Sequence, residues 1–477
     1  MDCLRNKIAG SAAGYVLVAT FLLGFTSCGG GGGGASGAPG SPSTAVSNST
    51  EYSSGSLGVF LSSGNATVAV PTASYSTGSS GNSSSVTPSN TAYLITLPNP
   101  QNSPSIQCPN MSAIGGINLD SQHSVGVAFD TASYTLGFFT FTAGSPPSVS
   151  TCDSFLLSSS SSSIVTSAGS TSVGGVVMDP SIQTAIVETG YGFQFVDYSN
   201  SSNPAISSVY PRIPPYSSSS SGGIDLVENF AYDPYLVVGG VSYKMILSGS
   251  GAVSYYKGDS DGNLLELADI KTGTIYRPDP QTKTFFPTGQ FNGCSADAIG
   301  IDTAYQVAII GCEYDGLQSS SPSTPSLITV LVNLNAMILN SLSRTYSLPQ
   351  SAISSVTLTP NAPPQNNIFV DSVNHIVMWG SGGDWGSSNA NNFSVAKLSD
   401  PFTSFGNGIV GGAAKLSSLQ LGWVGYGYPH GSAMYVDSSG NSVALWMNQS
   451  AQSLAMVKAN EILAGNTSTA VTYVTIP

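Results

Sequence analysis

The sequence predicts an all-β fold, a seven-bladed β-propeller of four-stranded antiparallel blades preceded by a signal peptide and a flexible linker. Short apolar runs are broken by Gly, Pro and Ser, no long 3.6-residue periodicity occurs, and one segment recurs every 54 to 69 residues. A unit of this size cannot bury its own apolar face and must pack on a neighbour. Radial stacking of four-stranded units leaves few exposed sheet edges, so seven such units fit one closed ring.

The recurring segment contains a short apolar run, a turn residue, four variable residues and a second apolar run. The seven copies begin at Leu57, Gly116, Gly175, Asn229, Ala298, Asn367 and Ala433. Their turn residues are Ser62, Asp120, Asp179, Asp233, Asp302, Asp371 and Asp437. Six equivalent aspartates could suggest a ring of metal ligands. An aspartate at a strand-to-turn junction accepts a hydrogen bond from the backbone two residues later, so we interpret them as structural.

Each hairpin is followed by a third β-rich stretch, such as LGFFTFTA at 136–143, while a fourth strand is less clear. The copy PHGSAMYVDSSGNSVALW at 429–446 resembles the unit of bacterial propellers of the YVTN and NHL-like type, over residues 55–477 as a whole. The chain departs from that pattern at Ser62 and lacks the family's sharper tetrapeptide signature. A stacked β-sandwich or a β-solenoid remains the alternative fold.

Residues 1–27 have the features of an export signal, with basic residues, an apolar centre at Ile8–Phe25 and small residues before Cys28. The run from Leu22 to Cys28 resembles a bacterial lipoprotein signal, although Phe25 stands where leucine is expected. The resemblance implies lipidation of Cys28, anchoring in the membrane through that lipid, and a place in the bacterial cell envelope. Within the same resemblance, Gly29 favours the outer membrane. An ordinary cleaved signal and an uncleaved anchor are the alternatives.

Residues 28–54 are rich in Gly and Ser and have few side chains to bury, so we expect a flexible tether before a propeller domain at 55–477. Only 8% of the 477 residues are charged, against roughly a quarter in an average soluble protein. A surface wetted by Ser, Thr, Asn and Gly suits an extracytoplasmic protein. The 12 basic residues form no cluster, which argues against a nucleic-acid partner because binding phosphates needs a positively charged stripe.

Four of the six cysteines remain after Cys3 leaves with the signal and Cys28 takes lipid. An even number in an oxidising compartment predicts disulfide bonds.

A hairpin turning at 302–304 would set Cys294 opposite Cys312, which predicts a cross-strand disulfide between them. Cys108 and Cys152 are then partners by elimination. Both lie late in consecutive units, and such positions need not approach within bonding distance.

No catalytic motif is present, and we assign no catalytic residue, no metal site and no cofactor. Three histidines are too few and too separated to show a metal-ligand spacing. The segment GDSDGN at 258–263 begins like a calcium loop but lacks the glycine at the loop's sixth position and the closing glutamate, so a solvent-exposed hairpin turn is favoured.

Aromatic residues give the candidate binding face. In a four-stranded meander, the loop from the second to the third strand and the loop to the next blade emerge on the same side. Such loops of units six and seven hold Asp384, Trp385, Trp423, Tyr426, Tyr428 and His430. Tyr210, Arg212, Tyr216, Tyr255, Tyr256 and Lys257 would lie on that side too. Exposed aromatics suit contact with a glycan or a protein, whereas the alternative is that they pack between blades.

These observations predict a non-catalytic binding or scaffold protein for a protein or glycan partner on the cell surface, acting as a monomer. One alternative is an extracytoplasmic enzyme, lactonase-like or glycan-cleaving, that uses carboxylates at the central channel. The other is a structural envelope lipoprotein without a small-molecule ligand.

Overall fold

The computed structural model describes residues 57–62, 65–77, 84–100, 102–130, 133, 135–142, 144, 146–157, 173–189, 192–211, 230–250, 264–269, 274–276, 294–314, 328–343, 353–357, 367–380, 392–398, 415–420, 432–448 and 453–477. All of them belong to one compact unit, Ala45–Pro477. The predicted signal at 1–27, Cys28 and the tether at 28–54 lie outside the described residues.

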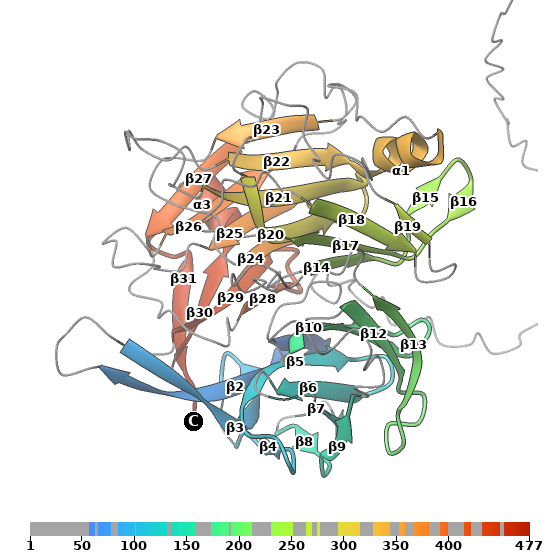
Figure 1. Ribbon diagram of the computed structural model, residues 1–477. Coiled ribbons are helices and arrows are strands. Elements are labelled where there is room, and N and C mark those ends of the chain that lie inside the picture. Colours follow the sequence, from blue (N-terminus) through green and yellow to red (C-terminus); the bar gives the residue numbers. More distant parts are fainter. Residues whose placement is uncertain are drawn as a thin grey trace, which may run out of the picture. The chain divides into compact units, whose positions relative to one another are not determined.

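The described strands form antiparallel sheets that follow the chain order (Figure 1), numbered sheet 1 to sheet 7 below. Sheet 1 contains β1 (Gly58–Ser62), β2 (Asn65–Thr77), β3 (Ser84–Leu97) and β4 (Ser105–Gln107). Sheet 2 contains β5 (Ile114–Asp120), β6 (Val125–Asp130), β7 (Thr135–Thr142), β8 (Ser148–Val149) and β9 (Asp153–Leu156). Sheet 3 contains β10 (Val173–Asp179), β11 (Thr184–Thr189), β12 (Gly192–Asp197) and β13 (Ala205–Pro211).

The second half of the chain repeats this arrangement. Sheet 4 contains β14 (Phe230–Asp233), β17 (Met245–Ser250), β18 (Leu264–Asp269) and β19 (Thr274–Tyr276). Sheet 5 contains β20 (Cys294–Asp302), β21 (Val307–Tyr314), β22 (Ile328–Asn333) and β23 (Ile353–Thr357). Sheet 6 contains β24 (Asn367–Asp371), β25 (Ile376–Gly380), β26 (Asn392–Lys397) and β27 (Lys415–Gln420). Sheet 7 contains β28 (Ser432–Val436), β29 (Ser442–Asn448), β30 (Ser453–Lys458) and β31 (Val471–Thr475).

The prediction of four strands in every one of seven blades is wrong. Among the described residues six sheets are four-stranded, and sheet 2 has five strands because β8 and β9 both pair with β7. The outer position of this sheet is therefore shared by two short strands. The turn that divides them could not be read from the apolar pattern, because neither strand carries an apolar run.

The core consists of apolar layers between consecutive sheets. Val127 and Phe138 of sheet 2 pack with Val176 and Val187 of sheet 3, and every residue of β5 and β6 is buried. Strands buried on both faces read as continuous apolar runs, which is the pattern seen in the sequence. The last sheet also packs on the first, because β28 contacts β1 and Leu445 shares a cluster with Val68. An all-β fold whose small sheets close on themselves is a β-propeller.

The first hairpin of sheet 4 differs from the prediction. The apolar run after Asp233 is not the second strand, which begins only at Met245. The run folds instead into a separate hairpin of β15 (Val237–Val238) and β16 (Val241–Ser242). Gly239 and Gly240 form its turn with φ of 58° and 82°, a conformation that a two-residue hairpin requires and that glycine adopts without strain.

The hairpin of sheet 5 has another register than predicted. Asp302 pairs with Val307, so the turn is 303–306, and a bulge lies between Ala296 and Ala298. Cys294 therefore faces Tyr314, while Cys312 faces Ala296. The direct opposition of Cys294 and Cys312 is wrong. Their side chains lie outside the described residues, so the bond itself stays a prediction.

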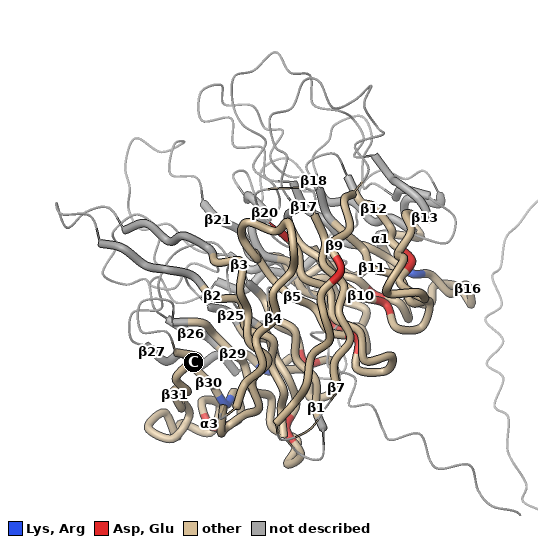
Figure 2. The backbone as a smooth tube through the Cα atoms, turned by 90° about the horizontal axis from the view of Figure 1, so that it is seen from below, with Lys and Arg blue, Asp and Glu red and all other residues tan. Residues whose placement is uncertain are grey.

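Among the described residues, two helices join third and fourth strands. Helix α1 (Leu334–Ser343) follows β22, and α3 (Ala459–Ala464) follows β30 and ends at Gly465 with φ of 87°. In the described part of the chain, no helix combines the length and the apolar character needed to cross a bilayer. Figure 2 shows how sparsely charged residues occur along the described backbone, as expected for 12 basic and 25 acidic residues in the whole chain.

Candidate functional site

The predicted binding residues fall in two segments, 381–391 and 421–431, which lie outside the described residues. Asp384 and Trp385 belong to the first, and Trp423, Tyr426, Tyr428 and His430 to the second. The strands that border these segments are described. Gly380 pairs with Phe393, and Asn392 pairs with Gln420, so β25, β26 and β27 all meet these segments at one end of sheet 6.

The further aromatic residues on the predicted face are described only in part. Tyr210 lies in β13 opposite Phe193, and its side chain is outside the described residues. Arg212, Tyr216, Tyr255, Tyr256 and Lys257 are outside them altogether, as is the segment 258–263.

The turn aspartates form the most regular group of polar residues in the described structure. One carboxylate oxygen, Oδ1, accepts a hydrogen bond from the backbone N–H two residues later in all six turns. The donors are Gln122, Ser181, Tyr235, Ala304, Val373 and Ser439, at 2.8 to 3.1 Å. The structural role predicted for these residues is confirmed.

Four of these turns also place a residue other than glycine in the left-handed region, four positions after the aspartate. These residues are Ser124, Gln183, Gln306 and His375, with φ of 47° to 58°. The conformation is uncommon for such side chains, and it lets the chain enter the second strand in register.

The second carboxylate oxygen, Oδ2, reaches a donor of the following sheet in four of the six turns. Tyr198 donates to Asp120 at 2.7 Å, across from sheet 3 to sheet 2. Ser442 donates to Asp371 at 2.5 Å, across from sheet 7 to sheet 6. These aspartates therefore connect one sheet to the next as well as closing their own turn. We call the contact between two consecutive sheets a joint.

The other two joints of this kind involve a charged or ionisable donor. Lys244 Nζ and Tyr232 Oη each lie 2.6 Å from Asp179 Oδ2, across from sheet 4 to sheet 3. His375 Nδ1 lies 2.9 Å from Asp302 Oδ2, and the His375 ring stacks on Tyr305 with centroids 3.6 Å apart.

Asp437 and Asp233 depart from this arrangement. Asp437 keeps both oxygens in its own turn, where Asn441 Nδ2 donates to Oδ2 at 3.0 Å. Asp233 is fully buried, and its Oδ2 has no hydrogen-bond partner. Among the described aspartate turns, only Asp233 leaves a buried carboxylate oxygen unpaired.

These surroundings shift the carboxyl pKa values in opposite directions. Burial favours the neutral acid, but hydrogen bonds from Lys244, Ser181 and Tyr232 outweigh it and lower the pKa of Asp179. Burial raises the pKa of Asp302 despite its bond to His375. Burial, with the nearby Asp302 charge, raises the pKa of Asp233 to about 6.

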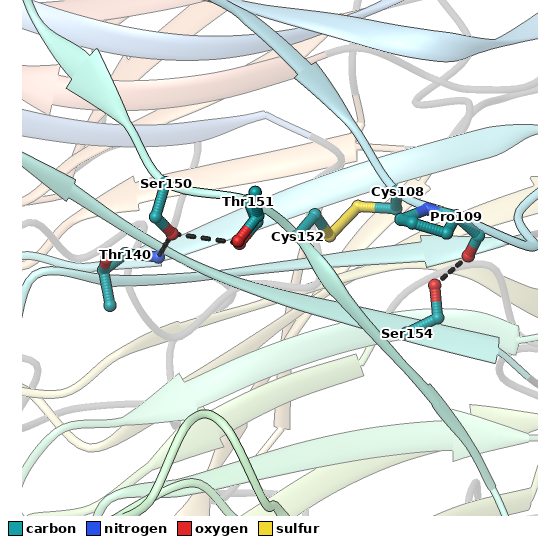
Figure 3. The surroundings of a disulfide bond; sticks show 7 residues. All are labelled: Cys108, Pro109, Thr140, Ser150, Thr151, Cys152 and Ser154. Carbon is teal, nitrogen blue, oxygen red and sulfur yellow. Dashed lines mark hydrogen bonds between the residues drawn. A yellow bond between two sulfur atoms is a disulfide. The ribbon is translucent and has the colours of Figure 1, made fainter.

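One joint is covalent. Cys108 follows β4 of sheet 1, Cys152 precedes β9 of sheet 2, and their Cα atoms are 4.9 Å apart across a disulfide (Figure 3). Cys108 and Cys152 are the two cysteines that the sequence paired by elimination. The fifth strand brings Cys152 back over β7, where Gly137 makes room: a Cβ there would lie 2.5 and 2.6 Å from the two sulfurs. Ser154 donates to the Pro109 carbonyl beside the bond.

Exposed apolar side chains gather on the inserted hairpin of sheet 4. Tyr235, Val237 and Val241 are 58%, 47% and 53% exposed. Leu339 of α1 is 52% exposed, and α1 contacts β15. This surface is at the end of the sheets where first and second strands connect, opposite the end that borders 381–391 and 421–431.

Sequence reasoning missed the donors that reach across the joints, namely Tyr198, Tyr232, Lys244, His375 and Ser442. A signal was present for some of them. Tyr232, His375 and Ser442 are polar or amphipathic residues within six positions of a turn aspartate in the next unit. Tyr198 follows the third strand, far from its own turn, and no spacing rule indicates it.

No protein-family model matches the sequence, and a search of curated proteins finds no match. Solved structures resemble the chain at low identity. A functionally unknown protein from Desulfotomaculum acetoxidans has 13% identity and a TM-score of 0.43, covering 81% of this chain and 96% of that one. A Bacteroides fragilis protein named "putative 6-phosphogluconolactonase" has 8% identity and a TM-score of 0.46, covering 83% and 91%. A Lactobacillus plantarum protein has 10% identity and a TM-score of 0.45, covering 86% and 96%.

Proposed function

We propose that this protein is an extracytoplasmic β-propeller lipoprotein that acts, without catalysis, as a binding or scaffold protein for a protein or glycan partner. It is a monomer anchored in the bacterial cell envelope, at the outer membrane, through lipid on Cys28. Its partner is contacted by the loops that hold Asp384, Trp385, Trp423, Tyr426, Tyr428 and His430.

The closure of the sheets on one another supports the binding part of this proposal. Because β28 packs on β1, all sheets belong to one ring, and loops leaving the same sheet end share one face. Gly380, Asn392 and Gln420 stand at that same end of sheet 6. The residue after the first segment, Asn392, pairs with the residue before the second, Gln420, so two aromatic-rich segments attached at one sheet end can supply one contact surface.

The scaffold part is supported by how the repeated carboxylates are used. Five of the six turn aspartates are buried, and all six bond their own turn. The chemistry that recurs in every unit from Asp120 onward therefore holds the fold. No described residue favours the enzyme alternative, which stays a prediction.

The test is the double variant Trp385→Ala with Trp423→Ala, displayed on whole cells of the producing bacterium and used to capture partners by cross-linking and on a glycan array. We expect capture to fall at least tenfold while the melting temperature stays unchanged. Tyr473→Ala is the matched control, because Tyr473 is an aromatic residue 50% exposed on the outer strand β31. Undiminished capture by the double variant, or an equal loss with Tyr473→Ala, would reject this face as the binding surface.

A further inference from the structure

We propose that the packing of sheet 4 on sheet 5 depends on protonation of Asp233. At mildly acidic pH Asp233 holds a proton, and the contact between the two sheets loosens when that proton is lost. The inference does not depend on the proposed function. It depends on the difference between Asp233 and the equivalent aspartates of the other sheets.

At this joint one carboxylate oxygen of Asp233 is buried without a hydrogen-bond partner. Asp233 ends β14, pairs with Met245 of β17, and is fully buried. Its Oδ1 accepts the Tyr235 N–H at 2.8 Å, while Oδ2 has no partner. Both β14 and β17 contact β20 of sheet 5, so the unpaired oxygen belongs to a packed joint. Burying an ionised carboxylate without a compensating partner is strongly unfavourable.

The charged groups around the joint do not relieve this cost. The nearby carboxylate of Asp302, at the end of β20, repels the Asp233 charge. His375 of sheet 6 is engaged with Asp302, at 2.9 Å from its Oδ2. Lys244, which precedes β17, is directed to Asp179 of sheet 3 instead.

A proton on Asp233 removes the repulsion and converts an unpaired acceptor into a donor. Burial and Asp302 raise the pKa of Asp233 from 3.8 to about 6. Between these values the folded chain holds a proton that the unfolded chain has lost. The stabilisation from that proton is therefore complete below pH 3.8 and is lost as the pH rises through about 6.

A bound cation is the competing way to satisfy Asp233. No set of three or more His, Cys, Asp or Glu side chains within the described ranges is arranged to hold a metal ion. Because one of the two neighbouring carboxylates is already engaged with His375, a proton on Asp233 is favoured over a metal ion.

The test compares the full chain with Asp233→Asn, a nearly isosteric change that removes the charge, in melting experiments between pH 4.5 and pH 8. We expect the variant to melt a few degrees above the natural chain at pH 8, with the gap narrowing steadily as the pH falls from 8 to 4.5. Asp437→Asn is the control, because Asp437 is partly exposed and satisfied within its own turn. It should show no such gap. A variant that melts below the natural chain at pH 8, or a gap that does not change with pH, would overturn the proposal.

Hydrogen exchange locates the effect. After correction for the chemical pH dependence of exchange, amides of β14 and β20 in the natural chain should exchange several-fold faster at pH 8 than at pH 5.5, whereas those of Asp233→Asn should not. Equal protection at both pH values would contradict the joint. If millimolar calcium at pH 8 raises the melting temperature of the natural chain but not of the variant, the site binds a cation and the proton proposal is wrong.

Discussion

The joints on the two sides of sheet 4 use the same turn residue with opposite results. Between sheets 3 and 4, Asp179 is buried and both its oxygens are bonded, with Lys244 and Tyr232 reaching Oδ2 from across the joint. Between sheets 4 and 5, Asp233 is equally buried and its Oδ2 has no partner. An aspartate at this position therefore closes its turn in either joint. Whether burial of its charge stabilises the ring depends on whether the next sheet supplies a hydrogen-bond donor to Oδ2.

The largest effect should come from breaking the satisfied joint. Asp179→Ala breaks the ion pair with Lys244, whose side chain is 12% exposed and still contacts the neutral Ser181 hydroxyl. We expect a loss of roughly 3–5 kcal/mol in the free energy of unfolding, measured by urea denaturation. Asp437→Ala is the control and should cost less, roughly 1–2 kcal/mol, since it removes the hydrogen bonds from Ser439 and Asn441 in a partly exposed turn and breaks no ion pair. Equal losses in the two variants would mean that the bond across the joint contributes nothing.

The second largest loss of stability should come from removing the disulfide. Replacing both Cys108 and Cys152 by alanine opens a crosslink that spans 44 residues and connects sheets 1 and 2. We expect the variant to lose roughly 2–4 kcal/mol, because the unfolded chain gains freedom. In a strong reductant the natural chain and the variant should become equally stable, because any contribution of the predicted Cys294–Cys312 bond is then removed from both. A variant as stable as the oxidised chain would show that apolar packing alone holds this joint.

A smaller effect should distinguish Asp179 from Asp233, because their contributions to stability depend on pH in opposite directions. The lowered pKa of Asp179 means that its stabilisation is present above pH 3.8 and is lost as the pH falls, the reverse of Asp233. Lys244→Met should cost roughly 2 kcal/mol at pH 7, since Asp179 keeps its bonds to Tyr232 and Ser181. The difference from the natural chain should shrink toward pH 2.5. A difference that stays constant over this range would contradict an ionised pair.

The sequence was sufficient to place the turn aspartates and to predict that each one bonds its own turn. The six aspartates stand at or directly after strand ends, and the predicted third strand at 136–143 coincides with β7 to within one residue. Both follow from local chemistry, because alternation between apolar runs and turn residues depends on neighbours along the chain.

The rest depends on contacts between units, which local patterns do not encode. The two glycines after Val238 divert an apolar run into an extra hairpin, and a bulge near Ala296 shifts the register around Cys294. Tyr198 lies 78 positions from Asp120, so its bond exists only after two sheets have packed. The predicted aromatic face around Trp385 and Trp423 is outside the described residues and stays a prediction.

The central claim, that turn aspartates fasten each sheet to the next, is tested most directly at the joint of Asp371 and Ser442. Ser442 is fully buried in sheet 7 and donates to Asp371 Oδ2 of sheet 6. A double-mutant cycle of Asp371→Ala and Ser442→Ala should give a coupling free energy of about 1 kcal/mol or more in urea denaturation. A coupling indistinguishable from zero would show that the two sheets are held by apolar packing and that the bond between them is incidental.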